Sequence, residues 1–409
     1  MSATETSEPQ PIPRLSTPEF IALMGMMFAT IAFSIDAMLP ALPEIATELT
    51  PDNMNYAQLV ITSFVLGMGA GTLLTGPISD TFGRKPVILA FTALYILGAA
   101  LAWAAGSMEL LIAARIVQGF GAAGPRVVAL ALVRDLYSGR EMARIVSFVM
   151  LVFTIFPAVA PLIGQGIITL FDWRAIFVAF LLFSLISVGW LTIRQPETLP
   201  PPMRRPMRVK SLWDGAKEAL SLRQMQLSIL VQTLIFGLLF GTISSIQPIF
   251  DLAYGRGEEF HWYFFVIALL AAPAAPLNGW LVVRVGMRPL VRTALWVQAT
   301  LSTLMAIVLL SSMAGPAEFW IYFVWTVSVF CLMGFTIGNL NALALEPLGH
   351  IAGLAASIMG GLATIAGAAV GALVGQLFTG TATPLAISVA ILTIIAAILM
   401  RFMPRDTAE

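Results

Sequence analysis

The chain has 409 residues, of which 58% are hydrophobic and only 11% are charged, whereas a soluble protein usually carries about 25% charged residues. No soluble core of this length needs so much apolar surface, so most of the chain is expected to lie in a lipid bilayer. Basic and acidic residues balance at 22 each, which gives no indication of nucleic-acid binding. One cysteine and two histidines exclude a disulfide framework and a multi-ligand metal site.

The first residues, MSATETSEPQPIPRLSTPE, are polar and rich in proline. They lack the basic region and short apolar core of a cleavable signal, so residues 1–17 are predicted to form a disordered cytoplasmic tail. A spanning helix needs roughly 20 mostly apolar residues. Twelve segments meet this requirement: 18–42, 56–78, 86–106, 108–134, 141–168, 174–194, 224–250, 259–283, 289–312, 317–344, 351–378 and 382–402. The predicted fold class is an all-α integral membrane protein with twelve transmembrane helices.

The basic residues are distributed unequally between the two sides of the membrane. If the N-terminus is cytoplasmic, all of the 22 Lys and Arg residues lie on the cytoplasmic side except Arg174 and Arg256 outside, and Arg115 and Arg126 within a span. Cytoplasmic loops carry an excess of Lys and Arg. We therefore predict that both termini are cytoplasmic.

The first span contains Asp36 in the apolar stretch IAFSIDAMLPALP. An ionised carboxylate in a span costs about 2.5–3.5 kcal/mol even on the lenient insertion scale. Asp36 lies about 27 Å from the cytoplasmic end of its span, and Pro40 one turn later removes a backbone donor to the Asp36 carbonyl. Asp36 is the one acidic residue well inside a span, whereas Glu346 lies near a span end and is a weaker candidate. Asp36 is therefore the candidate proton carrier, at the outer mouth of a hydrated path.

The fourth span contains two arginines, Arg115 and Arg126. Arg115 lies about 12 Å below the outer surface, at a depth comparable to that of Asp36. Burial disfavours an ionised carboxylate and a nearby cation favours it, so a change in hydration would switch the protonation of Asp36. The alternative is a static pair that locks two helices. Arg126 lies on nearly the same face, about 16 Å deeper, where it either faces a central cavity and favours anionic cargo or extends toward the headgroups.

The longest polar connection, 195–223, lies at the midpoint of the chain and is rich in Pro and Arg. It is predicted to be a cytoplasmic linker with an amphipathic helix, and it separates the halves 18–194 and 224–403. GPISDTFGRKP (76–86) in the first half aligns with GWLVVRVGMRP (279–289) in the second, and LIGQ (162–165) aligns with LVGQ (373–376). Duplicated halves are typical of secondary transporters. The repeat predicts two pseudo-symmetric six-helix bundles.

Three motifs resemble signatures of the major facilitator superfamily: GPISDTFGRKP after the second span, RIVQGFGAAG in the fourth and PAVAPLIGQ in the fifth, where Ala160 and Gln165 replace the usual glycines. Together with DAMLPALPEI, FDWRAIF and ALALEPLGHIAGLAAS, these motifs make the chain similar to the drug:proton antiporter branch of the bicyclomycin and chloramphenicol resistance type (Bcr/CflA). The resemblance implies proton-driven efflux of small amphipathic or polar compounds across a bacterial inner membrane.

The resemblance also implies where some of these residues act. It places the first and fourth spans side by side, and it places the loop after the second span near the start of the eleventh span and the end of the fourth. Asp80 would then face a helix N-terminus and Arg84 would pair with Asp135, forming a cytoplasmic gate. The predicted gate residues are Gly76, Asp80, Gly83, Arg84, Lys85 and Asp135, and the residues of the antiporter signature are Pro157, Pro161 and Gly164. The alternative for the loop is ordinary positive-inside charge.

Cargo contacts are expected from aromatic, methionine and amide side chains on helices that can line a cavity. The candidates, together with Arg126, are Phe33, Tyr56, Phe64, Met68, Phe236, Phe240, Gln247, Asn339 and Asn341. No cofactor or metal is expected, because a proton gradient supplies the energy. The expected partners are a small-molecule substrate, protons and the lipid bilayer, with no nucleic acid, and the protein is expected to be a monomer.

Three functions remain open from the sequence. The first is a proton-coupled drug exporter, and the second is an importer or exporter of a specific polar or anionic metabolite with the same fold, because a fold alone does not decide function. The third, a membrane-embedded enzyme, needs a buried nucleophile–base or metal constellation, for which the sequence offers no clustered residues.

Overall fold

The computed structural model describes residues 15–204, 206–311 and 315–404, and these residues are almost entirely helical. Most of the predicted tail, residues 1–14, lies outside the described residues, and the first helix begins at Thr17. Helices are expected because a bilayer offers no water to satisfy the backbone, so each spanning segment must form its hydrogen bonds internally.

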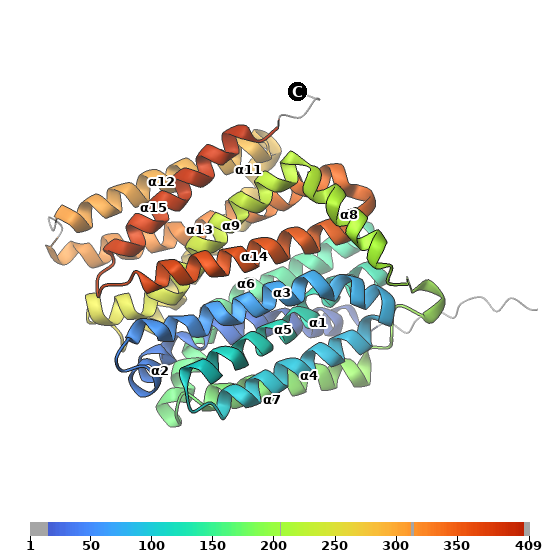
Figure 1. Ribbon diagram of the computed structural model, residues 1–409, viewed down its shortest axis with the longest axis horizontal. Helices are drawn as coiled ribbons and strands as arrows, with labels where there is room; N and C mark the ends of the chain where they lie inside the picture. The colour runs from blue at the N-terminus through green and yellow to red at the C-terminus, as the bar shows by residue number, and fades with distance from the viewer. Residues whose placement is uncertain (1–14, 205, 312–314, 405–409) are drawn as a thin grey trace, which may run out of the picture.

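The helices follow one another with short connections (Figure 1). They are α1 (Thr17–Asp36), α2 (Leu42–Leu49), α3 (Leu59–Phe82), α4 (Arg84–Trp103), α5 (Met108–Leu136), α6 (Gly139–Leu170), α7 (Ala175–Arg194), α8 (Val209–Ser221), α9 (Arg223–Pro248), α10 (Phe260–Ala271), α11 (Ala274–Val285), α12 (Met287–Ser311), α13 (Glu318–Leu345), α14 (Ala352–Gln376) and α15 (Thr383–Leu399). The shorter turns include η1 (Leu39–Ala41), η2 (Met54–Gln58), η3 (Pro201–Met203), the π-helical turn η4 (Ile249–Ala253) and η6 (Glu346–Ile351).

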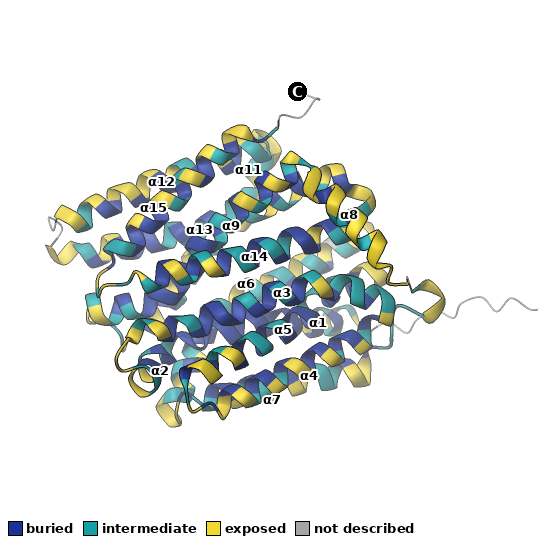
Figure 2. Cartoon of the chain, viewed as in Figure 1, coloured by how far each residue is buried: buried dark blue, intermediate teal, exposed yellow. Residues whose placement is uncertain are grey.

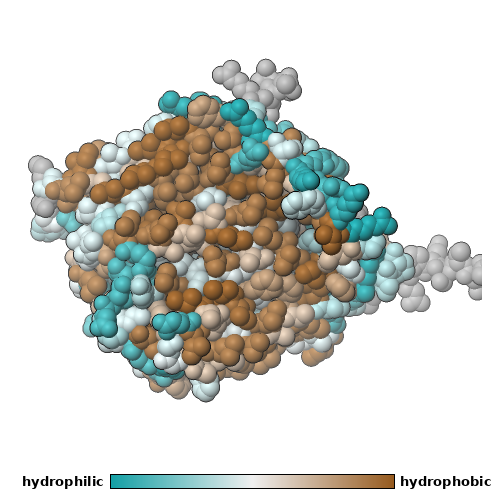
Figure 3. All heavy atoms as spheres, viewed as in Figure 1, coloured by the Kyte–Doolittle hydropathy of each residue, from teal (hydrophilic) through white to brown (hydrophobic). Residues whose placement is uncertain are grey.

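The predicted spans lie mainly on helix, but the predicted span 18–42 is interrupted after Asp36 by a turn at Ala37 and Met38. Within the described residues, 11 helical stretches are long and apolar enough to cross a membrane, and the longest of them, Gly315–Gln376, contains both α13 and α14. The predicted span 259–283 is divided at Ala272 and Pro273 into α10 and α11. Figure 3 shows an apolar surface across the middle of the molecule, with hydrophilic residues gathered toward its two ends. This distribution is that of a protein which spans a bilayer.

Helices of the same half of the chain make most of the contacts: α3 packs on α5, α4 on α5 and α7, and α1 on α6, while α9 packs on α14 and α12 on α15. Two seams join the halves, α3 against α14 and α6 against α10. Figure 1 shows α3 and α14 side by side in the middle of the molecule. Along this seam a Cβ atom at Gly69 would lie 2.8 Å from Ile365, and one at Gly76 would lie 3.0 Å from the Ser357 hydroxyl. The predicted domain boundaries and the symmetry of two bundles remain predictions.

The two loops that align in the sequence share one backbone turn. Gly83 ends α3 and precedes α4 with φ of +101°, and Gly286 ends α11 and precedes α12 with φ of +85°. Residues with a Cβ atom rarely adopt positive φ, so glycine is needed at both places. The sequence repeat is therefore also a repeat of local structure.

The helix predicted in the linker is present as α8, which lies across one end of the bundle in Figure 1. Its buried residues are Gly215 and Ala219, and it packs on α9 and α14. A Cβ atom at Gly215 would lie 2.8 Å from the Leu354 side chain, so α8 sits close to the start of α14. Figure 2 shows most of the remaining surface of α8 exposed.

Candidate functional site

Asp36 is the last residue of α1, where the helix stops inside the protein. A short turn at Ala37 and Met38 follows, and then η1, which contains Pro40. Because proline has no backbone N–H, the Asp36 carbonyl loses the helical partner it would otherwise have at this position. The side chain of Asp36 is only 5% exposed. Within the described residues no hydrogen bond or ion pair is found at its carboxylate, so the group is both buried and electrostatically unpaired in this conformation.

The antiporter signature on α6 lies directly against this break in α1. Gly164 faces the Ala37 carbonyl so closely that a Cβ atom there would overlap the carbonyl oxygen. Pro157 and Pro161 lie within α6, which continues as one helix through both. The predicted signature residue Gly164 therefore lets α6 reach the backbone that follows the candidate proton carrier.

Arg115 is fully buried where four helices of the first half meet. Its guanidinium donates to the Ser34 carbonyl of α1 at 2.8 Å, the Val60 carbonyl of α3 at 3.0 Å and the Gln118 amide oxygen at 2.7 Å. It also lies 4.4 Å from the centre of the Phe64 ring. Neutral acceptors and an aromatic face thus replace the hydration shell of the cation.

The predicted depth match between Asp36 and Arg115 does not produce an ion pair. Arg115 contacts the backbone of α1 at Ser34, two residues before Asp36, and it also donates to the side chain of Gln118, three residues later in α5. Each nitrogen of the guanidinium already donates to a neutral acceptor, so the cation is satisfied without a carboxylate. Within the described residues this conformation has no Asp36–Arg115 ion pair, so it gives no support to the alternative of a static pair, and the roles of the two residues in proton coupling stay predictions.

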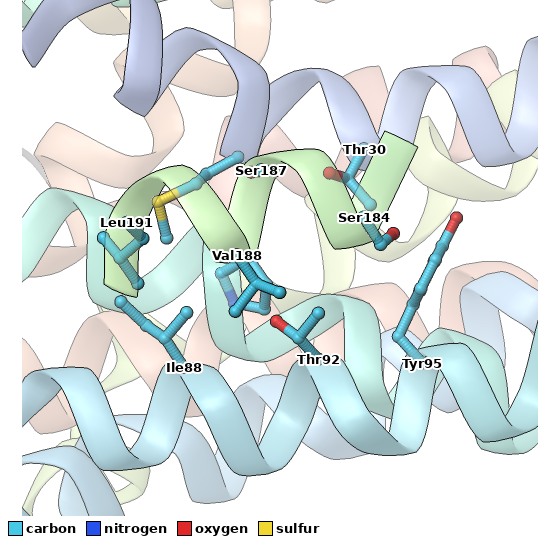
Figure 4. Close-up of a pocket in the computed structure, with 10 residues that line it drawn as sticks. Thr30, Ile88, Thr92, Tyr95, Ser184, Ser187, Val188 and Leu191 are labelled. Carbon is cyan, nitrogen blue, oxygen red and sulfur yellow. The ribbon is translucent and has the colours of Figure 1, made fainter. Parts of the chain in front are cut away.

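A small cavity with a mixed polar and apolar lining lies beside this network, between α1, α4, α5 and α7 (Figure 4). Tyr95 on α4 shares a hydrogen bond of 2.6 Å with the Ser34 hydroxyl, and Figure 4 shows its hydroxyl pointing toward the side of the cavity where Thr30 and Ser184 lie. The cavity has room for about one water molecule. Such a water would satisfy the Ser184 hydroxyl, for which no hydrogen-bond partner is found among the described residues.

None of the predicted cargo residues lines the cavity of Figure 4. Phe33 packs against Phe156, Phe180 and Phe183 within the first half. Five of the other candidates are buried, namely Phe64, Met68, Phe240, Gln247 and Asn339. Three are half-buried, namely Phe236, Asn341 and Arg126, and one, Tyr56 in η2, is exposed. Asn339 donates to the Asn278 amide oxygen at 2.7 Å, so it has a partner within its own half. The cargo roles of these residues therefore stay predictions.

The loop after α3 contains the predicted ion pair between Arg84 and Asp135, and a second ion pair between Arg84 and Asp80 that was not predicted. Arg84 is 6% exposed and contacts Asp80 at 2.5 Å and Asp135 at 2.9 Å, and it also donates to the Ser79 hydroxyl at 2.8 Å. Gly76 lies next to Ser357 near the start of α14. The predicted contact between Arg84 and Asp135 is thus present, whereas Asp80 pairs with Arg84, and no bond from it to the start of α14 is found in the described part of the chain.

The sequence interpretation missed Glu197, which lies in the linker. Its two carboxylate oxygens accept from the backbone N–H groups of Arg84 and Lys85, each at 3.0 Å, at the first turn of α4. A carboxylate is favoured at a helix N-terminus, where the backbone donors have no partner within the helix. The next residue, Thr198, donates to Asp135 at 2.9 Å. A linker carboxylate gave no sequence signal for this role, because its position depends on how the chain folds back after α7.

A polar contact between the two halves, also missed, lies at the opposite end of α3. Asn55 in η2 donates to the Phe378 carbonyl at 2.9 Å, and Gln376 at the end of α14 donates back to the Asn55 carbonyl at 2.9 Å. Ser245 on α9 donates to the Gln58 amide oxygen at 3.2 Å. The two halves are therefore joined by hydrogen bonds at this end and by close helix packing along the rest of the α3–α14 seam.

Comparison with known proteins identifies the family. A family model described as "Major Facilitator Superfamily" matches residues 22–370. The chain belongs to the major facilitator superfamily. Members of this superfamily are transporters, so the chain is a membrane transporter and not an enzyme.

The sequence relatives agree with the predicted branch. A protein named "Bicyclomycin resistance protein homolog" from Haemophilus influenzae is 29% identical over 394 residues, which cover 95% of this chain and 96% of the relative. "Multidrug resistance protein D" from Escherichia coli is 29% identical over 357 residues, 84% of each chain. "Chloramphenicol resistance protein" from Pseudomonas aeruginosa is 33% identical over 187 residues, 45% of this chain and 44% of the relative. The resemblance to the drug:proton antiporter branch of the Bcr/CflA type is confirmed.

Solved structures share the fold at lower identity. The structure titled "Crystal structure of D-xylose-proton symporter" superposes with a TM-score of 0.75 at 14% identity, covering 95% of this chain and 98% of that one. A partially occluded inward-open form of the xylose transporter XylE from E. coli gives 0.73 at 12% identity, covering 96% of this chain and 99% of that one. At such identities the likeness shows the fold alone.

Proposed function

We propose that this transporter exports small amphipathic drugs or related metabolites by alternating access, in exchange for protons. The observation that carries the proposal is Asp36, a 5%-exposed carboxylate without a partner at the point where α1 breaks. The names of the resistance relatives support drugs as the cargo class. The protein would act as a monomer of two pseudo-symmetric bundles in a bacterial inner membrane, with both termini in the cytoplasm.

In this proposal proton binding at Asp36 biases the conformation. A carboxylate that is buried and unpaired is tolerated in a dry, closed state when it carries a proton, and it favours a hydrated state when it releases that proton. A ligand shifts a conformational equilibrium only by its difference in affinity between the two states. Because Gly164 packs directly on Ala37, a movement of the backbone at Asp36 would also move α6. Arg115, bonded to α1 at Ser34, would hold the break in place and lower the cost of the ionised state as the helix moves.

The two polar regions at the ends of α3 would act as gates that open in turn. The ion pairs of Arg84 with Asp80 and Asp135 would hold the cytoplasmic end closed. The reciprocal hydrogen bonds between Asn55 and Gln376 would hold the outer end closed. Gly69 and Gly76 let α3 and α14 lie in close contact, and such a seam of small residues permits the two helices to move against each other.

A second candidate is transport of a specific polar or anionic metabolite by the same mechanism. Arg126 favours it, because a half-buried cation about three turns from Arg115 on the same helix would attract a negatively charged group. Competition between an anionic and a neutral test compound in the wild type and in Arg126→Gln would separate these classes. Selective loss of the anionic compound in the variant would support the metabolite function.

The central experiment is Asp36→Asn in purified protein reconstituted into liposomes with an imposed proton gradient. We expect the gradient to drive no net drug transport in this variant, because an amide of nearly the same shape cannot exchange a proton. The matched control is Glu44→Gln, an exposed carboxylate on α2, which should transport as the wild type does. Full gradient-driven transport by Asp36→Asn, with a normal elution profile in detergent, would rule out Asp36 as the carrier. A resistance screen of the wild type in a pump-deficient host would identify the cargo.

A further inference from the structure

Helix α8 carries an apolar arc that neither the fold nor the proposed transport cycle uses. At about 100° per residue, the residues of this arc fall within a narrow sector of the helix. They are Val209, Trp213, Ala216 and Leu220. The neighbouring sector holds Lys210 and Lys217, and the opposite side of the helix holds Ser211, Asp214 and Glu218. The helix therefore has an apolar stripe with a basic stripe along one edge.

The apolar arc is not the surface by which α8 packs on the protein. Gly215 and Ala219 face the bundle and are buried, whereas Val209 is 75% exposed, Trp213 is 61% exposed and Leu220 is 37% exposed. Leaving this much apolar surface in water is unfavourable, at about 25 cal/mol per Å². The arc thus requires a partner outside the described chain.

The composition of the arc and its edge matches the interfacial region of a bilayer. Tryptophan and lysine are typical of the headgroup level, because each combines an apolar body with a polar tip. The Lys217 ammonium lies 5.5 Å from the Trp213 ring centre, so the two residues form one local unit. On the opposite side Glu218 contacts His350 at 2.9 Å, which directs the acidic side of α8 toward the protein and water.

The position of α8 brings this face to the membrane surface. The helix leads directly into the spanning helix α9, and it lies at the end of the bundle where the apolar surface in Figure 3 gives way to hydrophilic residues. A helix at this level can place its exposed apolar arc in the headgroup region of a bilayer. Exposed Arg208 and Met207, immediately before α8, extend the same mixture of basic and apolar residues.

We infer that α8 is an anionic-phospholipid docking site, with Val209, Trp213 and Leu220 seated among the headgroups and Lys210 and Lys217 on the lipid phosphates. Basic residues near an anionic leaflet each contribute about 1 kcal/mol, which corresponds to roughly a fivefold preference per lysine. The site goes beyond the proposed transport function, because it concerns the lipid rather than the cargo or the proton.

The first experiment uses one fluorescent label on either side of α8. In a Cys331→Ser background, the full-length protein carries the label at Val209→Cys on the apolar arc, or at Ser211→Cys on the opposite side as the matched control. Each is reconstituted in phosphatidylcholine vesicles with and without phosphatidylglycerol, and quenching by spin-labelled phospholipid is measured. We expect strong quenching at position 209 that increases with phosphatidylglycerol, and weak quenching at position 211 in both lipids.

The second experiment removes the basic stripe with Lys210→Gln/Lys217→Gln and compares it with Arg140→Gln, an exposed basic residue at the start of α6. The double variant should lose most of the phosphatidylglycerol dependence at position 209, and Arg140→Gln should keep it. Equal quenching at positions 209 and 211, or quenching at 209 that is independent of lipid charge in the wild type, would overturn the inference. A doubled mass in detergent with position 209 protected would instead assign the arc to a second copy of the chain. Because no transport is measured, these outcomes are independent of the proposed function.

Discussion

The two aligned loops have the same backbone turn but different charges. In the first loop Gly83 follows Asp80 and precedes Arg84, and these two side chains form an ion pair. In the second loop Gly286 stands at the matching place, but Val283 and Met287 occupy the positions of Asp80 and Arg84. Val283 is 85% exposed, and the nearby Arg284 lies over the Trp280 ring at 3.9 Å. The first loop thus contains partly buried ion pairs, whereas the second contains a cation–aromatic contact between Arg284 and Trp280.

This difference shows that the backbone turn at the glycine does not depend on the ion pairs around it. Both glycines are required by positive φ, which is a local property of the backbone. The ion pairs of the first loop depend on residues from elsewhere, because Asp135 comes from the end of α5 and Glu197 from the linker. A gate built from such contacts would act mainly in the first half, so the cytoplasmic gate is expected to be asymmetric.

Among the substitutions that test this difference between the loops, Arg84→Ala is expected to lower the apparent unfolding free energy most. The side chain of Arg84 is 8% exposed and that of Asp135 is 19% exposed, so the substitution leaves partly buried carboxylates without their cation. We expect a loss of about 2 kcal/mol in apparent unfolding free energy, between the values for exposed and buried pairs. Chemical denaturation in detergent measures this loss. In the second loop Arg284→Ala should cost about 0.5 kcal/mol, as expected for an exposed cation–aromatic contact. Equal losses in the two loops would contradict the asymmetric gate.

A smaller effect is expected from Glu197→Gln. The carboxylate accepts from two backbone donors at the start of α4, and the amide can replace only one of these bonds and carries no charge toward the helix N-terminus. The expected loss in apparent unfolding free energy is about 1 kcal/mol. Glu141→Gln is a suitable control, because Glu141 is an exposed acid in the first turn of α6. Hydrogen exchange at the amides of Arg84 and Lys85 should increase in Glu197→Gln and stay unchanged in the control.

The sequence predicted the local features of the molecule well. Apolar segment length located the spanning helices, since a bilayer leaves few alternatives to a helix of about 20 residues. The motif loop correctly indicated the contact between Arg84 and Asp135. Pro40 indicated a lost hydrogen bond at the Asp36 carbonyl, but the predicted span continued to residue 42, whereas α1 ends at Asp36. Each of these features depends on residues close in the chain or on a motif that covers both partners.

Features that depend on packing between distant segments could not be predicted. Arg115 and Asp36 have comparable depths, but depth does not specify which donors of a guanidinium are already occupied by carbonyl groups. The candidate cargo residues were selected by type, and whether Phe33 faces a cavity or an aromatic cluster depends on helix rotation. Glu197 was missed because the path of a proline-rich linker has no periodic pattern from which to place a side chain.

The smallest effect is expected when an ion pair like that of the first loop is introduced into the second loop. Val283→Asp together with Met287→Arg would place opposite charges four residues apart, as in Asp80 and Arg84. Because position 283 is 85% exposed, solvent screens the new pair, and the coupling energy from a double-mutant cycle should be only about 0.3–0.5 kcal/mol. The corresponding cycle for Asp80→Ala and Arg84→Ala should give a larger coupling, because Arg84 is buried and Asp135 fixes its position. If the installed pair couples as strongly as the native pair, the strength of the first loop comes from the shared turn rather than from Asp135 and the linker.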